Sequence, residues 1–406
     1  MNLKMILISA AVLATVAEGD VAMNSCTSIG KSATGVRLEA MKASPNWRDG
    51  KFVNLLASIE PKFFEALGKW IRGADNTVPN TLLPVVERIA SDFDISPEGG
   101  LRITWFGHST LLVEIDGHRL LVDPVWSERP SPFSWMGPKR FHKTPLTIDE
   151  LPAIDVVVIS HDHFDHLDQY TIQALGKCAP LYVVPLGVGA HLEHWGVPSD
   201  RIIERDWWGN VKLGDLTLTA TPARHFSGRS LVMADKSETL WSGWVITGPE
   251  HRIYYSGDTG MFPDFVAIGE RLGPFDAVLI EIGAYDQLWA DLHIGPEQAI
   301  EARLAIGSGL FIPVHWGTFD LAMHAWTEPV ERVLVAAEKV GVQVVVPQPG
   351  ESIEPANPPE ITRWWPERPW QTAEEVPVVS SGLVQSQNIR QKSAEVQQVL
   401  SRIDRK

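Results

Sequence analysis

A histidine-rich stretch near the middle of the chain has the residue types and spacing of a metal site. His161, His163, Asp165 and His166 lie within the sequence SHDHFDHLD, residues 160–168. They follow the apolar run 156–159, whose short length and β-branched residues predict a buried strand. Imidazoles and carboxylates are common ligands of zinc and similar divalent metals. His161 and His163 point to the same side of an extended segment, and Asp165 and His166 follow where the chain turns. We therefore expect two metal ions.

A single histidine at such a place would most often be a surface or core residue that binds nothing. Three imidazoles this close together, directly after a hydrophobic strand, are hard to accommodate unless they share a metal. The pattern therefore favours a metal site over a histidine-decorated surface loop.

Three later segments repeat the arrangement of an apolar run followed by a metal-capable side chain. They are 216–222 before His225, 252–257 before Asp258, and 310–314 before His315. One such residue alone often only closes a turn. Together with the first motif, they indicate that several strand ends converge on one edge of a sheet.

Strand signals begin near residue 100 and mark the start of a domain. The apolar runs 101–106, 111–115 and 119–123 include an Asp-Gly pair that predicts a hairpin. His108, between two of these runs, either lies near the metals or bonds a backbone carbonyl. The long aromatic loop from 125 to 145 could wall a substrate channel or simply pack on the surface.

The composition excludes some classes of protein. The chain has 406 residues and a formal net charge of −15, which argues against a nucleic-acid-binding surface. With 44% hydrophobic and 21% charged residues, the bulk of the chain is globular. Its two cysteines, Cys26 and Cys178, cannot form a disulfide framework.

The first residues resemble an export signal. Lys4 precedes an apolar stretch over 5–17 that is too short to span a membrane and suits a signal peptide. Residues 1–26 are therefore expected to export the protein to a bacterial periplasm, or to anchor it as a lipoprotein through Cys26. The alternative is a cytoplasmic protein with an apolar first helix.

Segments without recognisable chemistry flank the central domain. In the extension 27–96, an amphipathic helix is expected over 61–71, with core packing as the default and an interaction face as the alternative. The C-terminal strap and tail, 353–406, end in a basic amphipathic pattern that could touch a membrane or a partner, or remain a solvated tail.

The combined motifs resemble the metallo-β-lactamase superfamily, and most closely its N-acyl-phosphatidylethanolamine-hydrolysing phospholipase D family in a bacterial form. The resemblance covers residues 97–352. It implies an α/β protein, of mixed α+β type, folded as an αββα sandwich. The stretches that carry it are 104–110, 135–141, 206–208, 256–260, 273–276, 282–285 and 315–319.

The resemblance also implies a ligand set for two zinc ions per chain. One zinc would be bound by His161, His163 and His225, the other by Asp165, His166 and His315, and Asp258 would bridge both. Such a pair would activate a water and neutralise the oxygens of a phosphodiester. Asp165 and Asp258 would orient that water. His293 would contact the substrate or leaving group, unless it only caps a helix or lies buried.

The function that the resemblance implies is hydrolysis of N-acyl-phosphatidylethanolamine, or a related phospholipid, to phosphatidic acid and N-acylethanolamine. The expected partners are this phospholipid and a membrane surface, without nucleic acid, and a homodimer is compatible with the sequence. One alternative is a lactonase or esterase of the same fold that acts on a small molecule. Another is a noncatalytic, zinc-stabilised lipid-binding protein of the envelope, which is disfavoured because structural zinc seldom needs a bridged pair with an open position.

Overall fold

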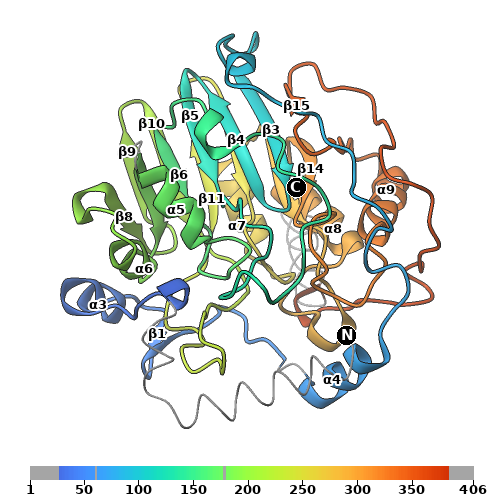
Figure 1. Cartoon of the computed structure of the whole chain (residues 1–406), viewed down its shortest axis with the longest axis horizontal. Helices are drawn as coiled ribbons and strands as arrows, with labels where there is room; N and C mark the ends of the chain where they lie inside the picture. The colour runs from blue at the N-terminus through green and yellow to red at the C-terminus, as the bar shows by residue number, and fades with distance from the viewer. Residues whose placement is uncertain (1–26, 60–61, 177–179, 384–406) are drawn as a thin grey trace, which may run out of the picture.

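Two β-sheets pack face to face and carry helices on their outer sides (Figure 1). The structure, a computed structural model, describes residues 27–59, 62–176 and 180–383. The predicted export signal, its Cys26 lipidation site and the basic amphipathic tail over 389–406 lie outside the described residues. No helix in the described part of the chain combines the length and apolar character needed to cross a membrane.

The first sheet has seven strands in the order β15-β3-β4-β5-β6-β7-β8. The predicted hairpin is confirmed, because Ile115 pairs with His118 around the Asp-Gly turn. Strands β5 to β8 are parallel, as expected for β-branched runs buried on both faces. The strands are β3 (Leu101–Gly107), β4 (Thr110–Ile115), β5 (His118–Val122), β6 (Val156–Val158), β7 (Leu181–Pro185), β8 (Ile202–Arg205) and β15 (Ser352–Ile353).

The second sheet has six strands in the order β14-β13-β12-β11-β10-β9. Strands β12, β13 and β14 are parallel, and β11 is antiparallel to both β10 and β12. The strands are β9 (Asn210–Leu213), β10 (Leu216–Thr221), β11 (Gly243–Thr247), β12 (Arg252–Tyr255), β13 (Ala277–Glu281) and β14 (Leu310–Val314).

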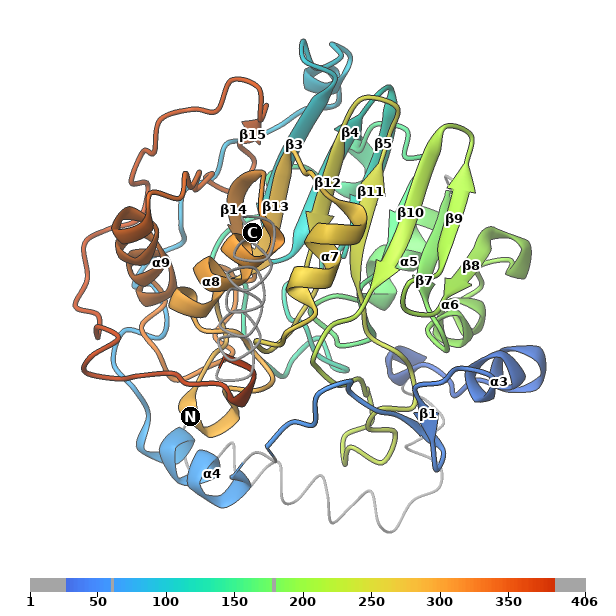
Figure 2. The same ribbon diagram turned by 180° about the vertical axis from the view of Figure 1, so that it is seen from behind.

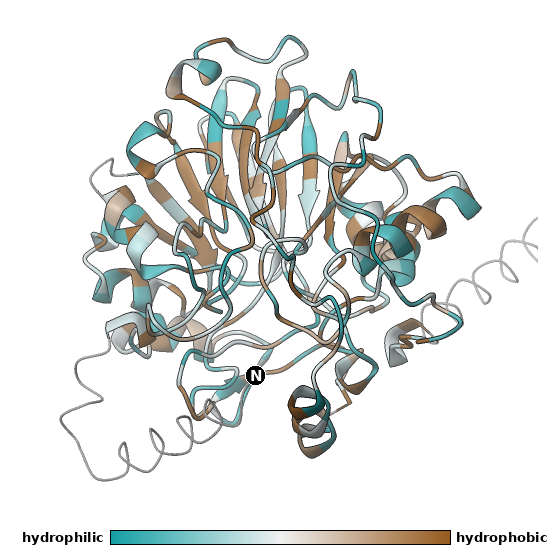
Figure 3. Cartoon of the chain, turned by 45° about the vertical axis from the view of Figure 1, so that its right-hand side comes forward, coloured by the Kyte–Doolittle hydropathy of each residue, from teal (hydrophilic) through white to brown (hydrophobic). Residues whose placement is uncertain are grey.

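The helices complete an αββα sandwich, as predicted. Helices α5 (Gln169–Leu175) and α6 (Gly189–His194) pack on the outer face of the first sheet through side chains such as Ile172 and Leu192. Helices α7 (Phe265–Leu272), α8 (Pro296–Ile306) and α9 (Glu328–Val340) cover the second sheet (Figure 2). Hydrophobic residues recur along the strands, whereas the outer helices mix hydrophobic and hydrophilic residues (Figure 3). The main core lies between the sheets.

The strand directions bring many carboxyl ends to one edge of the sandwich. In the first sheet β3, β5 and β6 run the same way, and in the second sheet β10, β12, β13 and β14 do. This edge lies at the lower side of the sheets in Figure 1. Every predicted metal ligand follows one of these strands in the sequence, so the topology gathers them there.

The first part of the N-terminal extension, residues 27–72, runs along this same edge, and the rest leads to the opposite end of the sheets, where β3 begins (Figures 1 and 2). It contains α3 (Gly35–Lys42), the strand pair β1 (Trp47–Arg48) and β2 (Lys51–Phe52), and α4 (Phe63–Arg72). Helix α4 confirms the predicted amphipathic helix, but core packing of its apolar face was the wrong default. Leu67 and Ile71 are exposed, because α4 lies outside the sandwich instead of on a sheet face.

Short 3₁₀ turns connect several of these elements. They are η1 (Thr27–Ile29), η2 (Ala90–Phe93), η3 (Ile148–Glu150), η5 (Ser199–Arg201) and η6 (Gln287–Trp289).

Candidate metal centre

One donor cluster is formed by His161, His163, His225 and Asp258, whose ligand atoms all lie within 4.8 Å of one another. Nδ1 of His163 is 2.8 Å from Nε2 of His161 and 3.2 Å from Nε2 of His225. Oδ2 of Asp258 lies 3.7 Å from Nε2 of His225. Three imidazoles and a carboxylate that converge in this way fit the donor set of a zinc ion.

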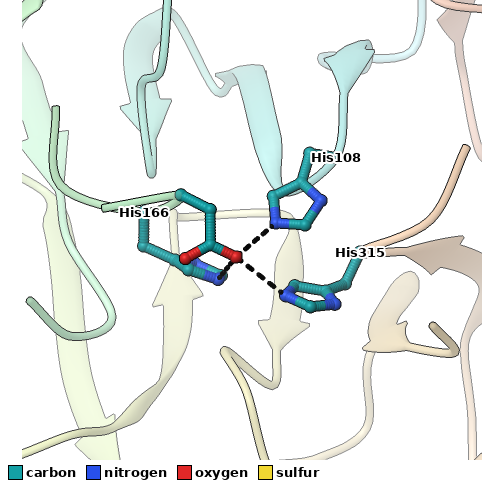
Figure 4. Close-up of side chains that lie close together, drawn as sticks. His108, His166 and His315 are labelled. Atoms are coloured by element: carbon teal, nitrogen blue, oxygen red, sulfur yellow. Dashed lines mark hydrogen bonds and ion pairs between the residues drawn. The ribbon is translucent and has the colours of Figure 1, made fainter. Parts of the chain in front are cut away.

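A second cluster contains His108, Asp165, His166 and His315. Figure 4 shows the three histidines directed at one carboxylate oxygen, Oδ2 of Asp165. Its distances to Nε2 are 2.9 Å for His108, 3.4 Å for His315 and 3.6 Å for His166. His108 therefore lies beside the predicted ligands, which resolves the two readings that the sequence leaves open for it.

Asp258 lies between the two clusters and faces both. Its Oδ1 is 3.1 Å from Nε2 of His166, and its Oδ2 is 3.1 Å from Nε2 of His315. The same Oδ2 is 3.8 Å from Nε2 of His161, in the other cluster. One carboxylate is thus within reach of two metal positions.

The buried donor atoms fit a metal better than they fit one another. Within the described chain, Nε2 of His166, Nε2 of His315 and Oδ1 of Asp258 are buried without a well-directed hydrogen bond, although each has an ion-pair contact of 3.1 Å. Buried polar atoms are normally satisfied, and leaving one unsatisfied costs about 1–3 kcal/mol. Divalent cations in the two clusters would satisfy these atoms.

The charges of the site depend on the balance between burial and neighbouring groups. Burial lowers the pKa of His161 and of His225 well below the usual value, so both are neutral, as metal ligands must be. Burial alone would also lower the pKa of His166 and His315, but Asp258 and Asp165, together with Asp123 at His166 and Glu281 at His315, outweigh it and raise both pKa values, to about 10 for His315. A metal bound there would displace these protons.

Asp123, which directly follows β5, bonds Nδ1 of His166, the ring nitrogen opposite the one that faces Asp258. Its Oδ2 accepts hydrogen bonds from Nδ1 of His166 at 2.7 Å and from the Tyr255 hydroxyl at 2.6 Å. Its Oδ1 accepts the backbone N–H of Ser160. A carboxylate behind a histidine ligand fixes the ring orientation and the tautomer. The sequence signal for this role is weak, because Asp123-Pro124 reads as a turn after a strand.

Glu281 and His293 form a second pair at the site. Nδ1 of His293 lies 2.8 Å from Oε2 of Glu281 and 3.9 Å from Oδ2 of Asp258. Oε1 of Glu281 accepts the backbone N–H of Thr259, next to Asp258. Sequence reasoning missed Glu281, although a charged residue that ends the apolar run of β13 was an available signal.

Left-handed backbone conformations mark two of the strand ends that carry donors. His108 has a φ of 52° and His315 a φ of 62°. The backbone N–H of His315 donates to the carbonyl of His108 at 2.9 Å, which joins the two sheets at the site. Such conformations in non-glycine residues cost about 1–3 kcal/mol each and cluster at functional sites.

The extension and the strap hold His225 in place. Asn54 donates to the His225 carbonyl and accepts its backbone N–H, at 2.8 and 3.1 Å. Next to it, the buried Arg224 pairs with Asp291 at 2.8 Å, and Asp291 accepts bonds from Ser380 and Ser381 of the strap. No local pattern could have predicted these contacts, because the partners are far apart in the sequence.

All seven predicted ligands lie in the two donor clusters, and His293 lies beside them. They are His161, His163, Asp165, His166, His225, Asp258 and His315. His324 belongs to neither cluster; it stacks on Tyr285 and lies beside the carbonyl of Ala325. Of the two readings of His108, the structure supports the one near the metals, and it adds Asp123 and Glu281 to the site.

Comparison with known proteins shows that this chain is similar to metal-dependent hydrolases. Residues 118–316 match the β-lactamase superfamily domain. The chain is 46% identical over 348 residues to an uncharacterized protein of Mycobacterium tuberculosis, with 83% of this chain and 91% of that protein covered.

Two further relatives have names that state a function. N-acyl-phosphatidylethanolamine-hydrolyzing phospholipase D 1 of Caenorhabditis elegans is 38% identical over 260 residues, which cover 61% of this chain and 72% of that protein. A UPF0173 metal-dependent hydrolase of Pyrobaculum aerophilum is 32% identical over 248 residues, which cover 59% and 98%.

Solved structures agree on the fold. The isothiocyanate hydrolase from Delia radicum gut bacteria has a TM-score of 0.51 and 22% identity, with 62% of this chain and 98% of that chain covered. At this identity the likeness supports the fold alone and says nothing about the substrate.

Proposed function

The chain belongs to the metallo-β-lactamase superfamily, and we propose that within it the protein is a binuclear zinc phosphodiesterase that cleaves N-acyl-phosphatidylethanolamine or a related glycerophospholipid. Its similarity to metal-dependent hydrolases supports a metal-dependent hydrolase of the β-lactamase fold. The bond cleaved, the lipid and the two zinc ions are the proposal.

The observation that carries the proposal is the position of Asp258 between two donor clusters. A carboxylate within 3.1 to 3.8 Å of four histidine nitrogens from both clusters is suited to bridge two ions. Two zinc ions, when bound, would lower the pKa of a water and neutralise the charge of a phosphodiester. The name of the C. elegans relative supports a phospholipid as the substrate.

The chain's own residues supply orientation and proton transfer. His108 holds Asp165 at 2.9 Å. Asp165 would accept a hydrogen bond from the attacking water, so that a lone pair of the water oxygen points at phosphorus. His293 is the best placed residue to contact the leaving group, because its side chain is partly exposed and Glu281 fixes its Nδ1 side. An imidazole supported by a buried carboxylate can deliver a proton to a leaving alkoxide.

The test is hydrolysis of N-acyl-phosphatidylethanolamine by purified protein reloaded with zinc, with products resolved by mass spectrometry. The expected result is release of N-acylethanolamine together with phosphatidic acid, which a chelator abolishes and zinc restores. Release of a fatty acid, or turnover of lactones without lipid cleavage, would reject the phosphodiester assignment while leaving the metal centre intact.

A further inference from the structure

The stretch that carries His161, His163, Asp165 and His166 contains no helix or strand. Residues 161–168, which we call the ligand segment, lie between the end of β6 and the start of α5. These four ligands therefore cannot take their positions from a sheet or a helix. Contacts from other parts of the chain must hold them, because a metal site keeps its geometry only when its ligands are supported from outside.

Arg229 closes over the ligand segment. It is 1% exposed and follows the ligand His225 by four residues. Its Nη1 donates to the carbonyls of Asp162 and Leu167, the second at 2.8 Å. The ring of Phe164, which lies between these two residues in the sequence, is centred 4.0 Å from Cζ of Arg229. One guanidinium therefore joins both ends of the ligand segment.

The other side of this guanidinium holds residues 27–33, which we call the N-terminal latch. Nε and Nη2 of Arg229 both donate to the carbonyl of Ser28, at 3.0 and 2.7 Å. The ring of Trp195 is centred 5.0 Å from Cζ of Arg229, and its Nε1 donates to the carbonyl of Thr27 at 2.7 Å. The chain from η1 to α3 lies below α6, at the edge that holds the metal ligands (Figures 1 and 2).

A second contact joins the latch to the ligand segment through His191 of α6. Its Nδ1 accepts the backbone N–H of Lys31 at 2.9 Å, which leaves Nε2 to donate to Oδ2 of Asp162 at 3.3 Å. Gly30 has a φ of 81°, and a Cβ there would lie 2.1 Å from Nδ1 of His191. Only glycine allows the backbone to approach the imidazole this closely. The latch is thus fastened to Asp162 by two routes.

The chemistry of the guanidinium explains why arginine occupies position 229. Its planar group presents donors in several fixed directions, so it can bond three carbonyls of two separate segments at once. A lysine would offer one nitrogen on a flexible stem and could not span the same acceptors. The side chain therefore does more than fill space between the latch and the ligand segment.

We propose that Arg229 and the N-terminal latch form a clamp that positions the ligand segment, so that release of the latch weakens metal binding. Arg229 is a positioning residue, because it acts through the carbonyls of the ligand segment. The inference concerns the metal centre alone and holds whichever bond the enzyme cleaves.

The first test is Arg229→Lys, which keeps the charge but loses the fork of donors. The zinc affinity of the full chain, measured by competition with a chromophoric chelator, should fall at least about tenfold. The visible spectrum of the cobalt-substituted protein, which reports the geometry of the ligands, should also change. A general loss of stability would not alter the spectrum of bound cobalt.

The matched control for this variant is Arg205→Lys. Arg205 also donates to backbone carbonyls, those of Asn210 and Glu204, but it lies at the end of β8 and bonds neither the latch nor the ligand segment. It should bind zinc and cobalt as the parent does. Parent-level zinc affinity or an unchanged cobalt spectrum in Arg229→Lys would overturn the proposal, and so would an equal loss in Arg205→Lys.

The second test reaches the latch without touching Arg229, in case Arg229→Lys does not fold. Gly30→Ala should push the latch away from His191 and lower the zinc affinity at least about threefold. Gly50→Ala is the control, because Gly50 also has a positive φ, 83°, but an added Cβ would meet nothing within 4 Å. Equal losses in the two variants would show that backbone strain alone is responsible and would overturn the role of the latch.

Combining the two changes tests whether the latch acts through the clamp. If it does, Gly30→Ala should lower the zinc affinity less in the Arg229→Lys background than in the parent, because the shared contact is already broken. Fold-changes that simply multiply would mean that the latch and Arg229 act independently, and would reject the clamp.

Discussion

Asp258 is the side chain that both donor clusters share, so its replacement tests the bridged centre directly. Asp258→Asn keeps the size of the side chain but removes the charge and one of the two oxygens that face the clusters. We expect activity to fall more than about 100-fold, and zinc content, measured by atomic emission, to fall below the parent value. An unchanged circular dichroism spectrum would show that folding is intact. Parent-level hydrolysis by this variant would refute the bridge.

Asp123 acts at one remove from the metal, through the His166 ring. Asp123→Asn should weaken zinc binding or activity by about 10–100-fold, because an amide no longer fixes the imidazole tautomer as a carboxylate does. The matched control is Asp116→Asn. Asp116 also bonds a histidine, His251, but it lies in the turn before β5, whereas Asp123 directly follows β5. Competition with a chromophoric chelator measures the affinity. A loss shared by both variants would indicate general destabilisation instead.

At the scale of elements, the Arg224–Asp291 pair joins β10 to the extension and to the strap. Both side chains are buried, and Arg224 also donates to Leu56 and Ala57 carbonyls. Asp291→Ala leaves an uncompensated buried guanidinium, so we expect a loss of about 3 kcal/mol in the free energy of unfolding, measured with urea.

The control for this prediction is Glu39→Ala, in an exposed pair with Lys42 on α3. Its loss should stay below about 0.5 kcal/mol. If Asp291→Ala cost no more than this control, the buried pair would not be what holds the extension and the strap to the site.

The elements that could be predicted are those whose sequence carries a local period. The runs 101–106, 111–115 and 310–314 became β3, β4 and β14 within about one residue, because short apolar β-branched runs have few other solutions. The ligands were found for the same reason, since each follows such a run.

What could not be predicted depends on contacts between distant segments. Asn54 meets His225 across 171 residues, and Asp123 meets His166 across 43. Neither contact leaves a periodic signal in the sequence. The exposure of the α4 face was equally hidden, because an amphipathic helix has the same pattern whether its apolar face meets a core or a membrane.

At the scale of the whole molecule, the metal centre joins the two sheets. His161 and His166 follow a strand of the first sheet, and His225, Asp258 and His315 follow strands of the second. Ions held between them would bind only the folded chain and so stabilise it, by about 4 kcal/mol per site at a free metal concentration 1,000 times the dissociation constant.

This stabilisation should grow with pH. Without metal, Asp258 and Asp165 raise the pKa of His166 and His315 against the effect of burial, to about 10 for His315. The stability that these charged histidines contribute is complete below their usual pKa of 6.5 and is lost as the pH rises toward the raised values. The metal affinity shows the opposite trend. For each proton that the metal must displace, this affinity rises about tenfold per pH unit.

The gap in melting temperature between zinc-loaded and chelator-treated protein should therefore widen from about pH 6 to about pH 8. Scanning calorimetry of both forms across this range measures the gap. In Asp258→Asn the gap should widen less, because the carboxylate that keeps His166 and His315 protonated is gone. A gap that stays constant in the parent would mean that both histidines are already neutral in the metal-free fold. Protons would then not compete with metal ions for the two clusters.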